Sequence, residues 1–198
     1  MTIKIKLQAT EANLFCSSKW WGDPDLPADM EYPTVEVTDE DGTYDYPLTF
    51  VCQIDCEDIA ALDPEGHLPH SGMFYVFAGL DEYLEQFDSP FHNGPGPWPK
   101  KMVVVKYTKA INFETFNSAI LVDDEDQPLT QPALKMTFEP GEEEGTCLLA
   151  DATDPVTFLR IASGTAGLQF PDGLSLCLRY SAADWAAGKW KLVKGSLE

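Results

Sequence analysis

The chain has 198 residues and carries 33 Asp and Glu against 13 Lys and Arg, a formal net charge of −20 at pH 7. This charge argues against nucleic-acid binding and against binding to anionic membranes, because both depend on clusters of basic side chains. With 44% hydrophobic and 12% aromatic residues, the chain has the apolar surface of a folded protein, and its length suits one domain or two small ones.

The first half of the chain has mostly strand patterns. Residues 3–7 alternate apolar side chains with lysine. The alternating runs 34–38 and 43–46 flank an Asp-Gly turn, which predicts a β-hairpin because glycine supplies the positive φ that the turn needs. Residues 48–54 predict a further strand. The run 73–78 is apolar throughout and rich in aromatics, which favours a central strand buried on both faces.

Three short helices are expected between these strands and near the end of the chain. Asp55 can cap a helix over 57–62, and residues 81–87 predict a second. Residues 181–187 begin with a capping-box-like pattern and predict a third helix, which Gly188 ends.

The second half adds more strands than helices. A loop with four prolines, 89–99, separates the halves. We therefore expect a β-rich α+β fold: one domain over 1–198, with two structural halves, 1–88 and 100–198, joined by this loop. The strands predicted after the loop are 101–107, 119–122, 134–138, 146–149, 156–161, 174–180 and 190–193.

The two halves share an order of features. In each, a strand that ends in aspartate precedes a strand led by glycine and then an acidic short helix. These features are 49–55, 72–77 and 81 in the first half, and 147–151, 173–178 and 184 in the second. The pattern indicates either an internal duplication or two unrelated β–α patterns with ordinary turns.

The compartment follows from the N-terminus and the cysteines. Residues 1–8 alternate lysine with apolar residues and lack the apolar core of a signal peptide, and the most apolar stretch, 73–80, is far short of the ~20 residues of a membrane helix. We expect a soluble, cytoplasmic protein whose five cysteines are reduced and mostly buried. Cys52 and Cys56 have C-x3-C spacing with no second pair, so we expect no zinc site there.

Catalytic and metal-binding candidates are few. His67 and His70, with Asp63 and Glu65 nearby, are the densest cluster of metal-ligand types, although prolines and glycine keep them off one helix face and a solvated loop is the alternative. Ser71 adjoins His70, but adjacent strand residues face opposite ways, so His70 is badly placed to activate it. We assign no catalytic residue, no cofactor and no metal.

Several motifs together resemble the YwqG-like bacterial proteins, a family known as a domain of unknown function. The motif that opens at Ser18 has Trp20-Trp21 where the family has Phe-Gly. The resemblance implies an α+β fold with a duplicated β-rich core, and it implies no established activity. The matching segments are 18–27, 32–33, 47–55, 72–77, 164–167 and 173–178.

One candidate ligand-binding patch lies around the first of these motifs. Lys19 is one of few cations and adjoins two tryptophans, so it could make a cation–π contact or receive an anionic ligand. The alternative is that the aromatics seal the core while Gln53 satisfies loop backbone. We expect one of the tryptophans to be largely buried and Lys19 to stay partly accessible. The patch comprises Ser18, Lys19, Trp20, Trp21, Tyr32, Phe50 and Gln53.

Two functional hypotheses follow. The first is a monomeric, non-enzymatic protein that binds a basic protein partner through an acidic surface with aromatic anchors, using acidic runs such as 123–126 and 142–144. One version, which the resemblance alone implies, is neutralisation of a basic bacterial toxin. The second is a small-molecule-binding protein or enzyme with a site around Ser18–Trp21. The charge is also explained if it serves only to keep the protein soluble and monomeric.

Overall fold

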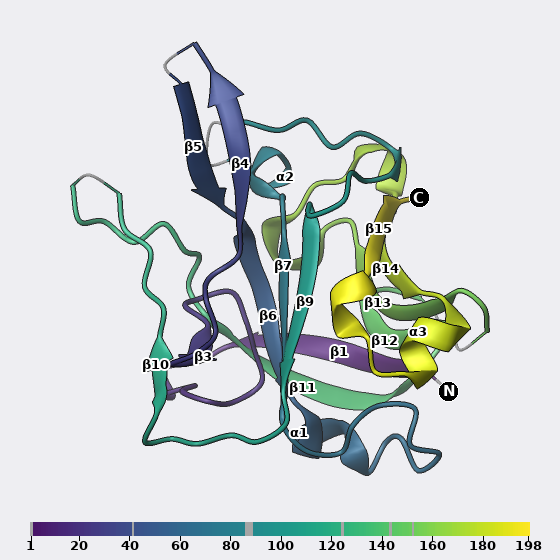
Figure 1. Ribbon diagram of the computed structural model, residues 1–198. Helices are drawn as coiled ribbons and strands as arrows, with labels where there is room; N and C mark the ends of the chain where they lie inside the picture. The colour runs from purple at the N-terminus through teal and green to yellow at the C-terminus, as the bar shows by residue number, and fades with distance from the viewer. Residues whose placement is uncertain (1, 41, 86–88, 124, 143, 152) are drawn as a thin grey trace.

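A curled antiparallel sheet forms the body of the protein (Figure 1). The computed structural model describes residues 2–40, 42–85, 89–123, 125–142, 144–151 and 153–198. Within these ranges the sheet has 11 strands in the order β8-β15-β14-β13-β12-β1-β11-β2-β6-β7-β9. The strands are β1 (Thr2–Ala9), β2 (Lys19–Trp20), β6 (Thr49–Asp55), β7 (Met73–Ala78), β8 (Gly96–Pro97), β9 (Val103–Thr108), β11 (Leu134–Gly141), β12 (Cys147–Asp151), β13 (Val156–Ala162), β14 (Ser175–Tyr180) and β15 (Lys194–Leu197).

Two small two-stranded ladders and several single-turn helices complete the fold. In Figure 1 the β4–β5 hairpin projects from the top of the molecule, and the connection that follows β10 projects beside it. The ladders are β3 (Asp25–Pro27) with β10 (Phe116–Ser118), and β4 (Thr34–Asp39) with β5 (Gly42–Pro47). The helices are α1 (Cys56–Ala60), α2 (Asp81–Leu84), α3 (Ala182–Ala186), η1 (Thr165–Gly167), η2 (Pro171–Gly173) and η3 (Trp190–Leu192).

The expected α+β class with a duplicated sheet is wrong. The structure is 43% strand and 12% helix, and its sheet curls into a half-barrel. The helices are single turns between strands, too short to form a layer of their own. In the first half β6 pairs directly with β7, but in the second half β13 lies between β12 and β14. The repeated sequence order therefore does not correspond to a repeated strand pairing.

Strand β7 is buried on both faces, as its apolar run predicted. All six of its residues are buried. Phe74, Val76 and Ala78 pack into the larger hydrophobic cluster, while Tyr75 and Phe77 pack into a second cluster that also contains residues of β3, β4 and β10. The sheet thus separates two cores, and the small ladders cover the second.

Local signals located some elements accurately and misplaced others. The predicted β4–β5 hairpin is confirmed, and so are the helix caps, because Asp55 accepts from the Glu57 amide at 3.0 Å and Ser181 accepts from the Asp184 amide at 3.1 Å. The strands predicted at 119–122 and 190–193 are wrong. The nearest strands are β10 at Phe116–Ser118 and β15 at Lys194–Leu197, and Trp190–Leu192 forms η3.

The remaining expectations about organisation are limited by what the structure describes. Helix α2 ends at Leu84, and residues 86 and 87 of the predicted 81–87 helix lie outside the described residues. The single domain with two halves stays a prediction, although strands from both halves of the sequence share the sheet. In the described ranges, no helix is long and apolar enough to cross a membrane.

The larger core should make a strong contribution to stability through its aromatic rings. Phe158 is 1% exposed, and its ring centroid lies 5.2 Å from that of Phe74 and 5.9 Å from that of Trp185. We expect Phe158→Ala to lower the free energy of unfolding by about 3–5 kcal/mol, because it removes buried apolar area and leaves a cavity. Phe113→Ala, at a position 67% exposed, should change it by less than about 0.5 kcal/mol in the same urea titration. If the two substitutions lowered the free energy of unfolding equally, the assignment of Phe158 to the core would be wrong.

Candidate functional site

A buried ion pair lies at the junction of the sheet and the β3–β10 ladder. The Lys19 ammonium contacts Asp25 Oδ2 at 2.6 Å, and the two side chains are 7% and 0% exposed. The expectation that Lys19 stays partly accessible is therefore wrong, because its ammonium points inward to Asp25. Burial of two charges is tolerated here because each is the other's counter-ion.

The rest of the Asp25 side chain is also hydrogen-bonded. Oδ2 accepts from the Gln53 side-chain amide at 2.7 Å and from the Cys16 backbone amide at 2.8 Å. Oδ1 accepts from the Ser118 hydroxyl at 2.6 Å. The Asp25 backbone is held as well, since its amide donates to Gln53 Oε1 at 2.9 Å and its carbonyl accepts from the Tyr75 hydroxyl at 2.7 Å. We refer to Lys19, Asp25, Gln53, Tyr75 and Ser118 as the Asp25 network.

The Asp25 network has the character of a structural cluster. Its carboxylate accepts four hydrogen bonds, which is about the capacity of an ionised aspartate. A carboxylate with these donors is occupied by its own neighbours. The network as a whole, with the backbone of Asp25, links β2, β3, β6, β7 and β10.

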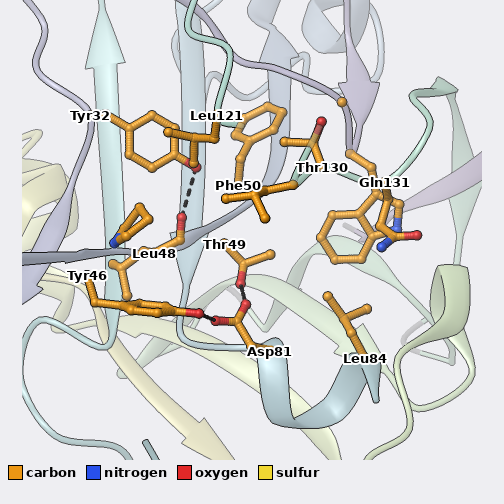
Figure 2. Close-up of a pocket in the computed structure, with 14 residues that line it drawn as sticks. Tyr32, Tyr46, Leu48, Thr49, Phe50, Asp81, Leu84, Leu121, Thr130 and Gln131 are labelled. Carbon is orange, nitrogen blue, oxygen red and sulfur yellow. Dashed lines mark hydrogen bonds between the residues drawn. The ribbon is translucent and has the colours of Figure 1, made fainter. Parts of the chain in front are cut away.

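An apolar pocket opens at the start of β6, between the hairpin and the connection after β10. Its volume is about 60 Å³. Figure 2 shows Tyr32, Leu48 and Phe50 along one part of the lining, with Leu121 and Thr130 on the side away from Asp81. We call this the hairpin pocket. It is lined by Trp21, Gly22, Tyr32, Tyr46, Pro47, Leu48, Thr49, Phe50, Asp81, Leu84, Leu121, Leu129, Thr130 and Gln131.

Asp81 contributes a buried carboxylate to this mostly apolar lining. The residue is 5% exposed. Its Oδ2 accepts from the Tyr46 hydroxyl at 2.9 Å, and its Oδ1 accepts from the Thr49 hydroxyl. Burial, and then the negative charge of Asp81, raise the pKa of Tyr46, so the phenol stays protonated and continues to donate.

Trp21 has a strained backbone in the wall of the hairpin pocket. Its φ is +58°, in the left-handed region that favours glycine, and the resembling family has glycine at this position. A tryptophan in this conformation costs about 1–2 kcal/mol. The conformation is held by two hydrogen bonds, from the Trp21 amide to the Val51 carbonyl at 2.9 Å and from the indole N–H to the Ala166 carbonyl at 3.1 Å.

The structure separates the seven predicted patch residues into three groups. Trp21, Tyr32 and Phe50 line the hairpin pocket. Lys19 and Gln53 belong to the Asp25 network. The last two residues lie elsewhere, as described next. The seven residues therefore do not line one cavity. The single ligand site that they were expected to form stays a prediction.

Ser18 and Trp20 have their own surroundings. The Ser18 hydroxyl donates to Asp58 Oδ2 at 2.6 Å and accepts from the Asp55 amide at 2.9 Å. Trp20 is fully buried in the larger core, and among the described residues its indole N–H has no hydrogen-bond partner. Both tryptophans are thus buried, as was expected of at least one.

Sequence reasoning missed Asp81, Tyr46 and the connection 119–131 as pocket residues. Asp81 was identified only as the start of a short helix. A carboxylate directly after a wholly apolar strand was the one available signal. Nothing local indicated that residues 121 and 129–131 would return to pack opposite Tyr46.

The two candidate metal ligands contact Asp63. His67 Nδ1 lies 3.0 Å from Asp63 Oδ1, and His70 Nε2 lies 2.9 Å from the Asp63 carbonyl oxygen. Hydrogen bonds from the Leu68 backbone and from His67 lower the pKa of Asp63 against the effect of its burial. Within the described ranges, no group of His, Cys, Asp and Glu has the arrangement of a metal site.

The acidic runs lie at the surface where they are described. Asp123, Glu125 and Asp126 are exposed on the connection after β10, and Glu142 and Glu144 are exposed between β11 and β12. Residues 124 and 143, which belong to these runs, lie outside the described residues. Asp123 also shapes its own loop, because its Oδ1 accepts from the amides of Glu125 and Gln127 at 2.9 and 2.8 Å.

All five cysteines lie in the described part of the chain, are buried, and carry thiols rather than disulfides. Burial raises the pKa of Cys16 and of Cys177 from 9.0 to about 11, and that of Cys56 to about 12. Thiols with such pKa values are protonated near neutral pH, which makes them poor nucleophiles.

The comparison with family models identifies the family. Residues 18–157 match the model described as "Domain of unknown function (DUF1963)". This match spans most of the chain and contains both the Asp25 network and the hairpin pocket. The chain belongs to that family. No curated protein matches the chain with significance.

The first test of this region concerns the buried ion pair. We expect Lys19→Met to lower the free energy of unfolding by about 3–5 kcal/mol, because it leaves Asp25 buried without its counter-ion. Lys6→Met is the matched control, since the Lys6–Glu139 pair has side chains 56% and 39% exposed and should contribute about 1 kcal/mol or less. If the two variants unfold at the same urea concentration, the buried pair does not have the role assigned to it.

A second test uses alkaline pH. Well below pH 9 the thiols are protonated in both the folded and the unfolded state. Between pH 9 and 11 the unfolded thiols ionise while Cys16 and Cys177 stay protonated in the native protein, so the free energy of unfolding should fall as pH rises. The buried tyrosines Tyr75 and Tyr180, whose pKa values burial also raises, act in the same direction at higher pH. Urea titrations across this range measure the slope, which should be shallower in Cys16→Ala. Stability that is constant from pH 9 to 11 would show that the thiols ionise equally in both states.

Proposed function

We propose that this protein is a non-enzymatic binding protein that holds a basic protein partner between the β4–β5 hairpin and the connection after β10. The single observation that carries this proposal is the hairpin pocket itself, an apolar cavity whose two projecting walls are acidic. Catalytic turnover is not part of the proposal.

The charge distribution supports a basic partner. Residues 34–47, which contain the hairpin, have five carboxylates and no Lys or Arg, and residues 112–133 have the same count. Five of the 13 cations line a different hollow, beside β9: Lys100, Lys101, Lys106, Lys191 and Lys194. The walls of the hairpin pocket thus project an unbalanced negative field, which accelerates encounter with a basic surface.

Exposed apolar side chains occur on the same two segments. Tyr44 on β5 is 42% exposed, and Ile120 and Val122 on the connection are 64% and 45% exposed. Large apolar groups next to carboxylates are typical of protein interfaces, in which apolar anchors are surrounded by a polar rim. These residues supply the anchors that an acidic surface alone would lack.

The finer parts of the proposal rest on the family. Assignment to the YwqG-like proteins agrees with the matched family. The proposal further includes that the protein is monomeric, has a single domain and is cytoplasmic. In one version of the proposal, the basic partner is a toxin that the protein neutralises.

A small-molecule site near Ser18–Trp21 is the second candidate. It is favoured by a hollow of about 710 Å³ that Lys19, Asp25 and Ser118 help to line. Lys19 and Asp25 neutralise each other across 2.6 Å, so the charge that this hollow offers a ligand is the carboxylate of Asp23. A ligand whose binding is abolished by Ser118→Ala but unaffected by changes on the hairpin would favour this candidate.

The test of the proposal is capture of a partner from lysate at about 0.1 M and 1 M salt, where the Debye length falls from ~10 to ~3 Å. The variant Glu125→Gln/Asp126→Asn removes two charges from the connection and leaves the loop-shaping Asp123 in place. The control Glu57→Gln/Glu65→Gln removes two exposed charges in and after α1, at the opposite end of the molecule from the hairpin (Figure 1).

We expect a basic protein to be captured at low salt and released at high salt. The Glu125/Asp126 variant should associate with it several-fold more slowly, and the control should associate like wild type. If no basic partner binds at low salt, or if both variants slow association equally, the proposal is wrong.

A further inference from the structure

Asp81 differs from the other buried carboxylates of the described chain. Asp25 and Asp63 are both 0% exposed, and each has a basic side chain beside it, Lys19 at 2.6 Å and His67 at 3.0 Å. Asp81 is 5% exposed, and no ion pair of the described residues includes it. Its hydrogen-bond donors are two neutral hydroxyls, those of Tyr46 and Thr49.

These two hydroxyls do not use the full capacity of the carboxylate. An ionised carboxylate can accept about four hydrogen bonds, and Asp25 shows that this fold can supply that many where they are needed. Asp81 has accepting capacity left, and it lines a cavity. Figure 2 shows the Tyr46 and Thr49 hydroxyls approaching the carboxylate at one end of that cavity.

The rest of the cavity suits an alkyl chain. The lining includes Leu84 and Tyr46 on the side of Asp81, and further aromatic area comes from Trp21, Tyr32 and Phe50. Aromatic rings stabilise a cation that enters between them and also pack against methylene groups. The volume of about 60 Å³ admits a compact ammonium group more readily than a planar guanidinium with its five donors.

We propose that the hairpin pocket receives a primary alkylammonium group, in the form of a lysine side chain of the basic partner, with the ammonium on Asp81 and the methylene stem along the aromatic wall. This inference rests on the proposed function and specifies its central contact. A buried lysine–carboxylate pair gains little net free energy over an apolar contact, but a wrong side chain leaves Asp81 unpaired. The pocket therefore contributes mainly to the choice among partner side chains and less to the affinity.

The direct test is an NMR titration of the full chain with Nα-acetyl-lysine methylamide. The comparison compound is Nα-acetyl-norleucine methylamide, which has the same stem without the ammonium. We expect saturable shifts of the backbone amides of Leu48, Phe50 and Asp81 with the lysine compound, and binding about tenfold weaker with norleucine. Equal binding of the two compounds, or no binding of the lysine compound, would overturn the inference.

Two variants locate the contact. Asp81→Asn keeps the shape and one acceptor but removes the charge, and it should abolish the preference for lysine over norleucine. Asp45→Asn is the matched control, because it removes one charge from the exposed face of the same hairpin and should keep the preference. Since Asp81→Asn also weakens the bonds from Tyr46 and Thr49, a second variant, Leu121→Trp, fills the pocket from the side opposite Asp81 and should block both compounds.

The outcome separates this inference from the proposed function. If the lysine compound fails to bind, or if its preference survives Asp81→Asn, while a basic partner is still captured in a salt-dependent way, the lysine contact is wrong and the acidic surface stands. If no basic partner is captured at low salt but the preference for lysine is found and lost in Asp81→Asn, the pocket recognises free amines and the protein-partner proposal falls.

Discussion

The buried carboxylate of Asp25 is the constraint on which the arrangement of this protein depends. It lies on a three-residue strand outside the main sheet, yet its contacts reach β2 through Lys19, β6 through Gln53 and β10 through Ser118. Its backbone carbonyl adds β7 through Tyr75. Segments about 90 residues apart in sequence meet at one charge. Since a buried carboxylate is tolerated only with its donors in place, these segments are held to one geometry.

That geometry positions the hairpin pocket. Ala119, which follows β10 directly, donates its amide to the Pro24 carbonyl at 2.8 Å, next to Asp25. The connection that continues to Leu121 and Leu129 is thus fixed at its start, and it returns as one wall of the pocket. The opposite wall of the pocket is the hairpin, which leads directly into β6, the strand that supplies Gln53 to the Asp25 network. Two buried carboxylates therefore differ in role: Asp25 is saturated by the protein's own groups and organises the fold, while Asp81 keeps accepting capacity toward a cavity.

The sequence predicted those elements whose signals are local. The hairpin around residue 42, the doubly buried β7 and the caps at Asp55 and Ser181 each depend on a few neighbouring residues, and all were found. Elements made by long-range pairing were not: β2 has two residues and β3 three, and β10 pairs with β3 across about 90 positions. Lys19 was expected at the surface because lysine usually lies there, and only Asp25, placed by the fold, explains its burial. The duplication was inferred from strand patterns that recur, although the pairing of β12 with β13 differs from that of β6 with β7.

Hydrogen exchange at two amides tests the central role of Asp25 most directly. The Cys16 amide donates to the Asp25 carboxylate, and the Asp25 amide donates to Gln53, although neither lies in the main sheet. If the Asp25 network holds the fold together, both amides should exchange only on global unfolding, as slowly as the amides of β6 and β7. Exchange of these two amides at the rate of a local loop opening, while β6 and β7 remain protected, would contradict that role.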